Sequence, residues 1–179
     1  MDERWDAVTE VALRARRGDT AAATAFVRAT QADVWRLCVH LGSRAGADDL
    51  TQETYARAFA SLHRFAGRSS AHTWLLGIAR RVCADAVRGA VRDRRSPGGG
   101  TLRLPADPAE TVALQALLDD LGTERREAFV LTQLVGLSYA EAADVCGCPV
   151  GTIRSRVARA RADLVAGLGA APESREGTG

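Results

Sequence analysis

Residues 138–164 read SYAEAADVCGCPVGTIRSRVARARADL, and this stretch decides what kind of fold the chain adopts. Ser138 and Glu141 have the S-x-x-E spacing of a capping box, which predicts a helix that starts directly after Ser138. Gly147 follows the apolar run and can take the left-handed conformation that ends a helix. Pro149 has no backbone N–H, so it fits the first turn of a second helix. The stretch therefore predicts a helix, a tight turn and a second helix.

The second helix of this pair has an apolar side and a polar side. At about 100° per residue, its apolar residues fall on one face, where they can pack against the first helix: Val150, Ile153, Val157, Ala160 and Leu164. The opposite face carries mostly small side chains, namely Gly151, Thr152, Ser155, Ala158 and Arg159, with Arg154, Arg156 and Arg161 at its borders. Small side chains allow close approach to base edges, and arginines suit phosphates or guanine. An ordinary solvated amphipathic helix could share this composition, but the order of cap, turn and helix favours DNA binding.

The whole chain is predicted to be all-α and to form two small helical modules. Alanine and arginine are abundant and strand formers are sparse, which favours helix throughout the 179 residues. Residues 94–108, RRSPGGGTLRLPADP, form the one strong break, because prolines and consecutive glycines are typical of a linker. We therefore expect a first module over 11–94, a linker over 95–108 and a second module over 109–169. The polar, Gly-rich residues 170–179 are expected to be a disordered tail.

Charge is distributed unevenly, although the net charge is only +2. Residues 64–95 contain eight arginines against two aspartates, a net charge of +6. Residues 150–164 carry a net charge of +3, and residues 111–149 between these two regions carry −4. Two basic regions separated by an acidic one indicate two contacts with a polyanion.

The chain shows no sign of a membrane, secretory or metal-dependent role. Its N-terminus, MDERWDAV, has no apolar signal-peptide core, and no apolar run approaches membrane-spanning length. The four cysteines, Cys38, Cys83, Cys146 and Cys148, lack disulfide-framework spacing, which predicts reduced thiols in a cytoplasmic protein. Cys146 and Cys148 could bind a metal or sense redox state, but no His or second Cys pair completes a zinc set. We expect no cofactor and no metal.

Two motifs of the first module could mediate binding. In residues 49–54, DLTQET, Asp49, Gln52 and Glu53 share one helix face and could dock on a protein, although an acidic first turn favoured by the helix dipole would look the same. Asp48 or Asp49 is expected to cap this helix. Residues 64–81, RFAGRSSAHTWLLGIARR, mix aromatic and basic side chains, as single-stranded DNA-binding segments do. Packing of the aromatic residues in the core remains the alternative.

Taken together, DLTQET, the RF-x-G-x-x-S-x-x-TWL-x-x-IA-R segment and GCPVGTIRSRVARAR resemble the extracytoplasmic-function (ECF) group of sigma-70-type RNA polymerase sigma factors. Their order and separation match as well. DVWR, RSSAHTWLL and LTQLVGLSYAEAADVCGCPV resemble the actinobacterial sigma-C subgroup within it. The resemblance covers nearly the whole chain and implies sigma region 2 in the first module and sigma region 4 in the second.

The resemblance also implies partners and a role for individual residues. The implied partners are core RNA polymerase and promoter DNA, with room for an anti-sigma factor as well. The polymerase would be contacted through the clamp helices of its largest subunit and again through region 4. Three sets of residues match the family's motifs. The resemblance assigns polymerase binding to Asp49, Gln52 and Glu53. It assigns recognition and melting of the −10 element to Phe65, Arg68, Ser69, Ser70, His72, Trp74, Arg80 and Arg81. It assigns recognition of the −35 element to Thr152, Arg154, Ser155, Ala158 and Arg159.

Three other functions fit parts of the sequence. A helix-turn-helix regulator that acts without polymerase would explain residues 138–164 but not DLTQET or the TWL segment. A redox sensor or interaction protein could act through Cys146 and Cys148. An enzyme is not expected, because the chain has no HExxH, P-loop or nucleophile elbow.

The opposite charges of the two modules suggest self-inhibition. Without polymerase, the acidic part of the second module could fold back over the basic −10-binding surface of the first.

Overall fold

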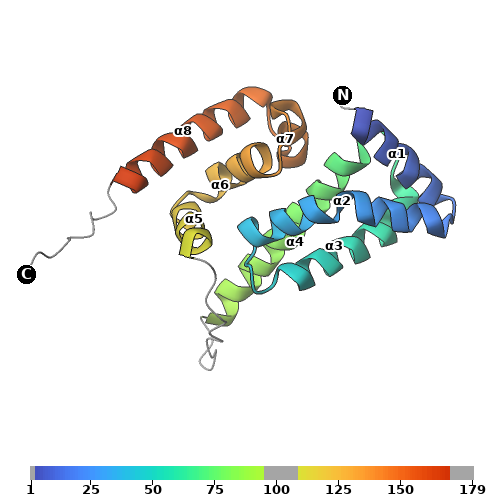
Figure 1. Cartoon of the computed structure of the whole chain (residues 1–179), viewed down its shortest axis with the longest axis horizontal. Coiled ribbons are helices and arrows are strands. Elements are labelled where there is room, and N and C mark those ends of the chain that lie inside the picture. The colour runs from blue at the N-terminus through green and yellow to red at the C-terminus, as the bar shows by residue number, and fades with distance from the viewer. Residues whose placement is uncertain (1–2, 95–108, 170–179) are drawn as a thin grey trace, which may run out of the picture.

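The computed structural model describes residues 3–94 and 109–169, and every regular element in them is helical, so the predicted all-α class is confirmed. The first group of helices consists of α1 (Glu3–Arg16), α2 (Thr20–Leu41), α3 (Ala47–Ser61), a 3₁₀ turn (Leu62–Arg64) and α4 (Ala71–Arg94). The second consists of α5 (Ala109–Asp119), α6 (Thr123–Phe129), a π-helical turn (Val130–Leu134), α7 (Tyr139–Cys146) and α8 (Val150–Gly169). Figure 1 shows the two groups side by side.

The first module is wider than expected, because it includes all of α1. We predicted a start near residue 11, but α1 begins at Glu3 and packs against α2 and α4. Its buried residues Trp5, Val8 and Ala12 follow a helical spacing. Charged residues lie between them in the sequence. Residues 95–108 and 170–179, where we predicted a linker and a tail, lie outside the described residues.

The buried apolar residues of the two modules form one continuous cluster. In the first module, Phe26, Leu37, Leu75 and Leu76 are fully buried between α2 and α4. In the second, Leu118, Leu131, Ile153 and Val157 fill the space among α5, α6, α7 and α8. Burial of these side chains stabilises each module by about 1.5–3 kcal/mol per residue.

The helix-turn-helix is built as predicted. The Ser138 hydroxyl accepts a hydrogen bond from the Glu141 backbone N–H at 3.2 Å, and the Glu141 carboxylate accepts one from the Ser138 N–H at 2.9 Å. Gly147 ends α7 in the left-handed conformation, with φ of 66°. Pro149 lies one residue earlier than we predicted, directly before α8, and its carbonyl accepts the Thr152 N–H at 2.9 Å. A proline before the first turn costs no helical hydrogen bond.

The start of α3 differs from the prediction. Gly46 is its N-cap, and no side chain caps it. Asp48 instead accepts a hydrogen bond from the Trp35 indole N–H at 3.0 Å, which ties α3 to α2. A tertiary contact thus uses the carboxylate that the local pattern assigned to capping.

Candidate nucleic-acid interface

The polar ridge predicted on α3 lies on the surface. Asp49, Gln52 and Glu53 are all exposed, one helical turn apart. Glu53 accepts a hydrogen bond from Arg57 at 2.7 Å, and Arg57 also donates to Asp85 of α4 at 2.8 Å. These two carboxylates, Asp85 first, raise the pKa of Arg57. The ridge is accessible to a protein partner and is held in place from α4.

The segment before α4 contains a loop with a defined shape. Ser70 caps α4, because its hydroxyl accepts the Thr73 N–H at 3.0 Å and lies 2.8 Å from the Thr73 hydroxyl. Gly67 has φ of +69°, a conformation that a side chain would strain. Phe65 packs against Trp74, with ring centroids 5.0 Å apart. The loop is therefore fixed at both ends.

The eight residues predicted to face the −10 element divide into two sets. Arg68 and Arg81 are exposed, and Ser69, Trp74 and Arg80 are partly exposed. Phe65, Ser70 and His72 are buried instead of lying on the surface. The physical reason is that Phe65 fills the space under Trp74, Ser70 caps α4, and His72 is enclosed by α1 and α2. Their side chains shape the loop and present no surface to DNA in this structure.

His72 is fully enclosed. Its ring stacks on Trp5 at a centroid distance of 3.4 Å and an interplanar angle of 3°. Its Nε2 lies 3.1 Å from the Asp33 carboxylate, and Arg36 pairs with the same aspartate at 2.9 Å. The segment's aromatic and basic composition did not predict these partners, because they come from α1 and α2.

The outer face of α8 presents the residues predicted to read the −35 element. Arg154, Ser155, Ala158 and Arg159 are exposed and Thr152 is partly exposed. The Ser155 hydroxyl donates to the Thr152 carbonyl at 2.9 Å, so it would have to exchange that bond to contact a base.

The four arginines of α8 differ in their partners. Arg156 pairs with Glu124 at 2.6 Å, and Arg161 donates to the Gln133 amide oxygen at 2.6 Å. Among the described residues, Arg154 and Arg159 have neither an ion pair nor a side-chain hydrogen bond. Arg156 and Arg161 are thus bonded to α6 and the π-helical turn, whereas Arg154 and Arg159 remain available for a ligand.

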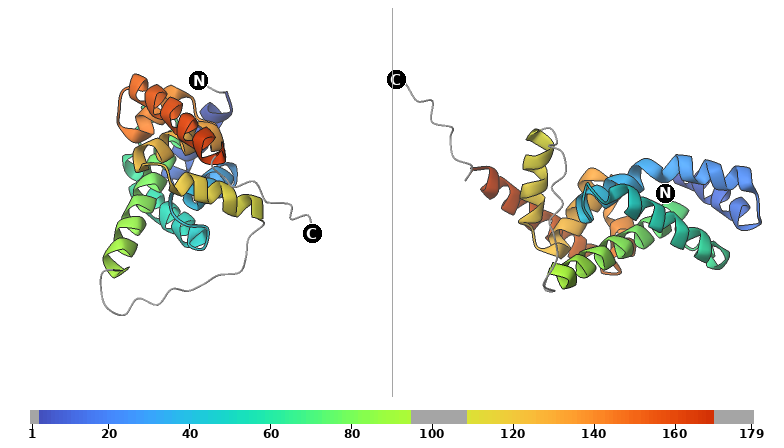
Figure 2. Two further views of the ribbon diagram at one scale, coloured as in Figure 1. Left: turned by 90° about the vertical axis from the view of Figure 1, so that its left-hand side faces the viewer. Right: turned by 90° about the horizontal axis from the view of Figure 1, so that it is seen from below.

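The two modules contact each other across the surface predicted to bind the −10 element. Arg80 of α4 donates to Glu127 of α6 at 2.9 Å. A small cleft brings Asp144 and Val145 of α7 against residues of α4 and the preceding loop, namely Ser69, Thr73, Trp74, Gly77, Arg80 and Arg81. In the right-hand view of Figure 2, the second module meets the first at one end, and α8 extends away from it. The acidic part of the second module thus faces the basic part of the first.

A second contact between the modules is centred on His40 at the end of α2. Arg126 donates to the His40 carbonyl at 2.6 Å, and the His40 Nδ1 lies 3.1 Å from the Gln115 amide oxygen. Burial, more than the nearby Arg126, Arg36 and Arg44, lowers the pKa of His40.

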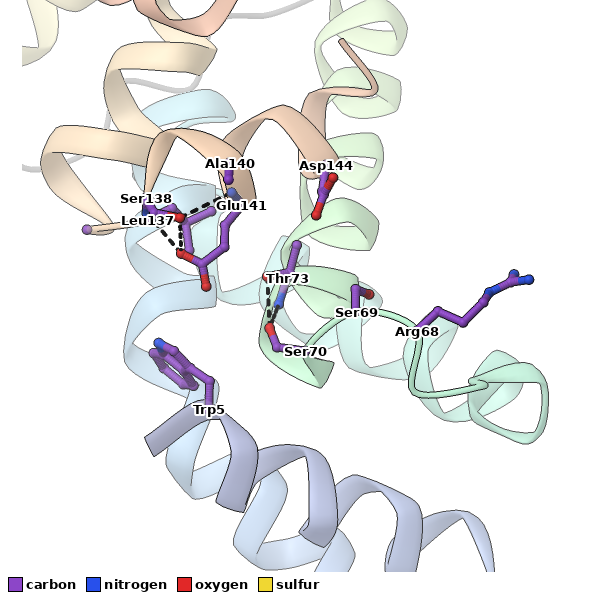
Figure 3. Close-up of a pocket in the computed structure, with 11 residues that line it drawn as sticks. Trp5, Arg68, Ser69, Ser70, Thr73, Leu137, Ser138, Ala140, Glu141 and Asp144 are labelled. Carbon is purple, nitrogen blue, oxygen red and sulfur yellow. Dashed lines mark hydrogen bonds between the residues drawn. The ribbon is translucent and has the colours of Figure 1, made fainter. Parts of the chain in front are cut away.

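A cavity of about 590 Å³ opens between α7 and the loop before α4. Figure 3 shows Ser138, Glu141 and Asp144 of α7 on one side, and Trp5, Ser70 and Thr73 on the other. Arg68 extends away from the α7 side of the cavity. The hydrogen bonds drawn in this view join residues on the same side of the cavity.

Neither the cysteines nor the acidic residues of the described chain form a metal site. No group of three or more His, Cys, Asp or Glu side chains in residues 3–94 and 109–169 is arranged to hold a metal ion. Burial raises the pKa of Cys146 to about 11, and Cys148 accepts a long hydrogen bond from Arg156 at 3.6 Å. No helix within the described ranges has both the length and the apolar character needed to cross a membrane.

Sequence profiles of two protein regions match the chain. "Sigma-70 region 2" matches residues 26–93, and "Sigma-70, region 4" matches residues 111–164. The first range covers most of α2 to α4, and the second covers most of α5 to α8.

Individual proteins match over most of their length. The chain is 51% identical over 168 residues to "ECF RNA polymerase sigma factor SigC" of Mycobacterium tuberculosis, covering 90% of this chain and 91% of that protein. It is 30% identical over 168 residues to the "ECF RNA polymerase sigma-E factor" of Escherichia coli, covering 83% and 87%. The solved structure of CnrH, in complex with the cytosolic domain of CnrY, has a TM-score of 0.76 and 28% identity, covering 92% of this chain and 98% of that one. RpoE of Bartonella quintana, in complex with the anti-sigma factor NepR, has a TM-score of 0.71 and 30% identity, covering 82% and 96%.

The chain therefore belongs to the sigma-70 family of RNA polymerase sigma factors. Within that family it falls in the ECF group, and mycobacterial sigma-C factors are among its relatives, as the sequence motifs predicted. The alternative of a helix-turn-helix regulator that acts without polymerase is not favoured, because the matches include region 2 as well as region 4.

Proposed function

We propose that this sigma factor binds core RNA polymerase through Asp49, Gln52 and Glu53 and reads promoter DNA with two separate surfaces. The observation that carries the proposal is the exposure of all three ridge residues and of the outer face of α8 in one chain that matches both sigma regions. The second module would add another polymerase contact. The chain supplies specificity and performs no chemistry of its own.

The −10 surface in this proposal consists of the accessible members of the predicted set. These are Arg68, Ser69, Trp74, Arg80 and Arg81. Arginine with a partly exposed tryptophan suits single-stranded DNA, through charge along the backbone and stacking on bases. The −35 surface is the outer face of α8, with Arg154 and Arg159 as the available cations.

The arrangement of the modules supports a closed free state, as the opposite charges predicted. Arg80 is occupied by Glu127, and α7 covers its neighbours. Binding at the −10 element therefore requires the second module to move away. One of the structural relatives, RpoE, was solved with the anti-sigma factor NepR, and a similar partner could hold this chain inactive too.

The test is reconstitution with core RNA polymerase. Adding the purified chain should give transcription that depends on promoter sequence. A Gln52→Ala, Glu53→Ala double variant should bind core more weakly while it binds duplex −35 DNA as the parent does. Glu10→Ala, at an exposed position on α1, is the control. Failure of the parent chain to form a stable complex with core would refute the proposal.

A further inference from the structure

One face of α1 runs along the whole loop that precedes α4. Trp5, Thr9, Leu13 and Arg16 are spaced by four, four and three residues, so they lie on one side of the helix. Trp5, Thr9 and Arg16 contact the segment 65–72, and Leu13 lies near Gly67. The order of these neighbours along the segment is antiparallel to their order along α1. The profile of sigma region 2 begins at residue 26, so α1 lies outside it.

The contacts at the two ends of the loop are hydrogen bonds to its backbone. Arg16 donates to the Phe65 carbonyl at 2.7 Å. The Thr9 hydroxyl accepts the Ala71 N–H at 2.9 Å and donates to the Trp5 carbonyl at 2.8 Å. The Ala71 N–H belongs to the first turn of α4, where no carbonyl of the same helix is available. Thr9 therefore provides a bond that the helix cannot make for itself.

The remaining neighbours of α1 along this segment are apolar and aromatic groups. Leu13 Cδ1 would lie 4.0 Å from a Cβ atom built on Gly67, so the loop backbone passes close to α1 where φ is positive. Trp5 stacks on His72 directly after the loop.

We propose that α1 is a template that sets the conformation of the loop 65–71, with Thr9 and Arg16 as positioning residues for reading of the −10 element. The inference rests on the proposed function, since it assigns the loop the role of presenting Arg68 and Ser69 to DNA. Neither Thr9 nor Arg16 needs to touch DNA. Each acts through a backbone group of the loop, so each influences base discrimination without contributing to the −35 or polymerase contacts.

The first test measures amide hydrogen exchange at Ala71 in the free chain. Thr9→Val keeps the shape of the side chain but removes the acceptor, so exchange of this amide should be about two- to tenfold faster. Thr9→Ser should restore the parent rate. Thr24→Val is the matched control, because Thr24 donates to the carbonyl four residues earlier at 3.1 Å but lies exposed on α2. Equal rates at Ala71 in the parent and in Thr9→Val would overturn the proposed contact.

The second test uses holoenzyme assembled from core polymerase and the full chain, so that the −10 surface is not covered by the second module. Partly single-stranded promoter DNA, randomised at both elements, is selected by binding and sequenced. Thr9→Val and Arg16→Met should lower the preference among −10 sequences several-fold and leave the preference among −35 sequences unchanged. Arg17→Met, the exposed neighbour, is the charge control.

The outcomes separate this inference from the proposed function. A parent chain with −35 and −10 preferences, combined with variants that retain both, would overturn the template and leave the sigma function intact. A parent chain with no −10 preference would overturn the proposed −10 surface, and the template with it. A parallel loss of both preferences together with a lower Tm would show that α1 only stabilises the module.

Discussion

Individual arginines in α8 differ in how much they can contribute to DNA binding. Arg156 and Arg161 already have partners on α6 and the π-helical turn, whereas Arg154 and Arg159 do not. An arginine with an intramolecular partner must exchange one bond for another when it binds DNA, so its net contribution is smaller. The identity of the residue alone does not distinguish these cases.

We expect Arg159→Ala to weaken binding of duplex −35 DNA by about 1–3 kcal/mol, if Arg159 makes a bidentate base contact. Titration of labelled duplex at fixed salt measures the change. Arg161→Ala is the control and should have a smaller effect, since Arg161 is bonded to Gln133. Equal losses in both variants would indicate that α8 contributes only general charge.

At the scale of helices, the ends of a helix can be predicted from the sequence where the cap or turn requires specific residue types. The capping box at Ser138 and the left-handed Gly147 were predictable, because each requires few residue types. The start of α3 was not, because Asp48 bonds to Trp35 from another helix. The burial of His72 and Phe65 was not predictable either, because their neighbours Trp5 and Trp74 are brought close only by packing.

The surface residues of the candidate site were easier to predict than its supports. The sequence motifs pointed to Arg68, Arg80 and Arg81, which lie at the surface or at the contact between the modules. They did not point to Thr9 or Arg16, since a threonine and an arginine on a helix have no distinctive pattern. The helical spacing of Trp5, Val8 and Ala12 could have revealed α1 but not its contacts with the loop.

We expect Ile153→Ala to destabilise the second module by about 2–5 kcal/mol, because Ile153 is fully buried and its removal leaves a cavity. Urea denaturation followed by circular dichroism measures the loss. Val165→Ala, at a position of the same helix that is 69% exposed, should change stability by less than about 0.5 kcal/mol. A small effect of Ile153→Ala would contradict the packing of α8 described above.

At the scale of the whole molecule, the two modules are held together by apolar packing, in which α4 meets α7, and by a few polar contacts. Arg80 bonds to Glu127, and His40 contacts both Arg126 and Gln115. Polar contacts of this kind weaken when one partner changes charge, so the closed state can be tested one group at a time.

We expect Glu127→Gln to open the free chain, because it replaces the charged partner of Arg80 and costs the closed state about 1–3 kcal/mol. Small-angle X-ray scattering should then show a larger radius of gyration. The control is Glu124→Gln, which removes a carboxylate that pairs with Arg156 inside the second module. An unchanged radius for Glu127→Gln would show that Glu127 does not hold the closed state.

We also expect acid to favour opening through His40. Its pKa is lowered in the closed state from the ordinary value of 6.5, so the closed state prefers the neutral imidazole. Neutral His40 contributes fully to the stability of the closed state above about pH 6.5, and this contribution is lost as the pH falls toward the lowered pKa. Scattering measured from about pH 7.5 downward follows this loss. His40→Gln should reduce the pH dependence, and His63→Gln, at an exposed position, should not.

In the proposed function, the bond between Arg80 and Glu127 makes −10 DNA and the second module competitors for one guanidinium group. The apparent affinity of the free chain for −10 DNA then equals the intrinsic affinity multiplied by the fraction of open molecules. If about one molecule in 100 is open, binding is weakened about 100-fold without any change at the DNA-binding surface. A ligand that prefers the open chain, polymerase included, strengthens the binding of −10 DNA. By reciprocity, −10 DNA strengthens the binding of that ligand by the same factor.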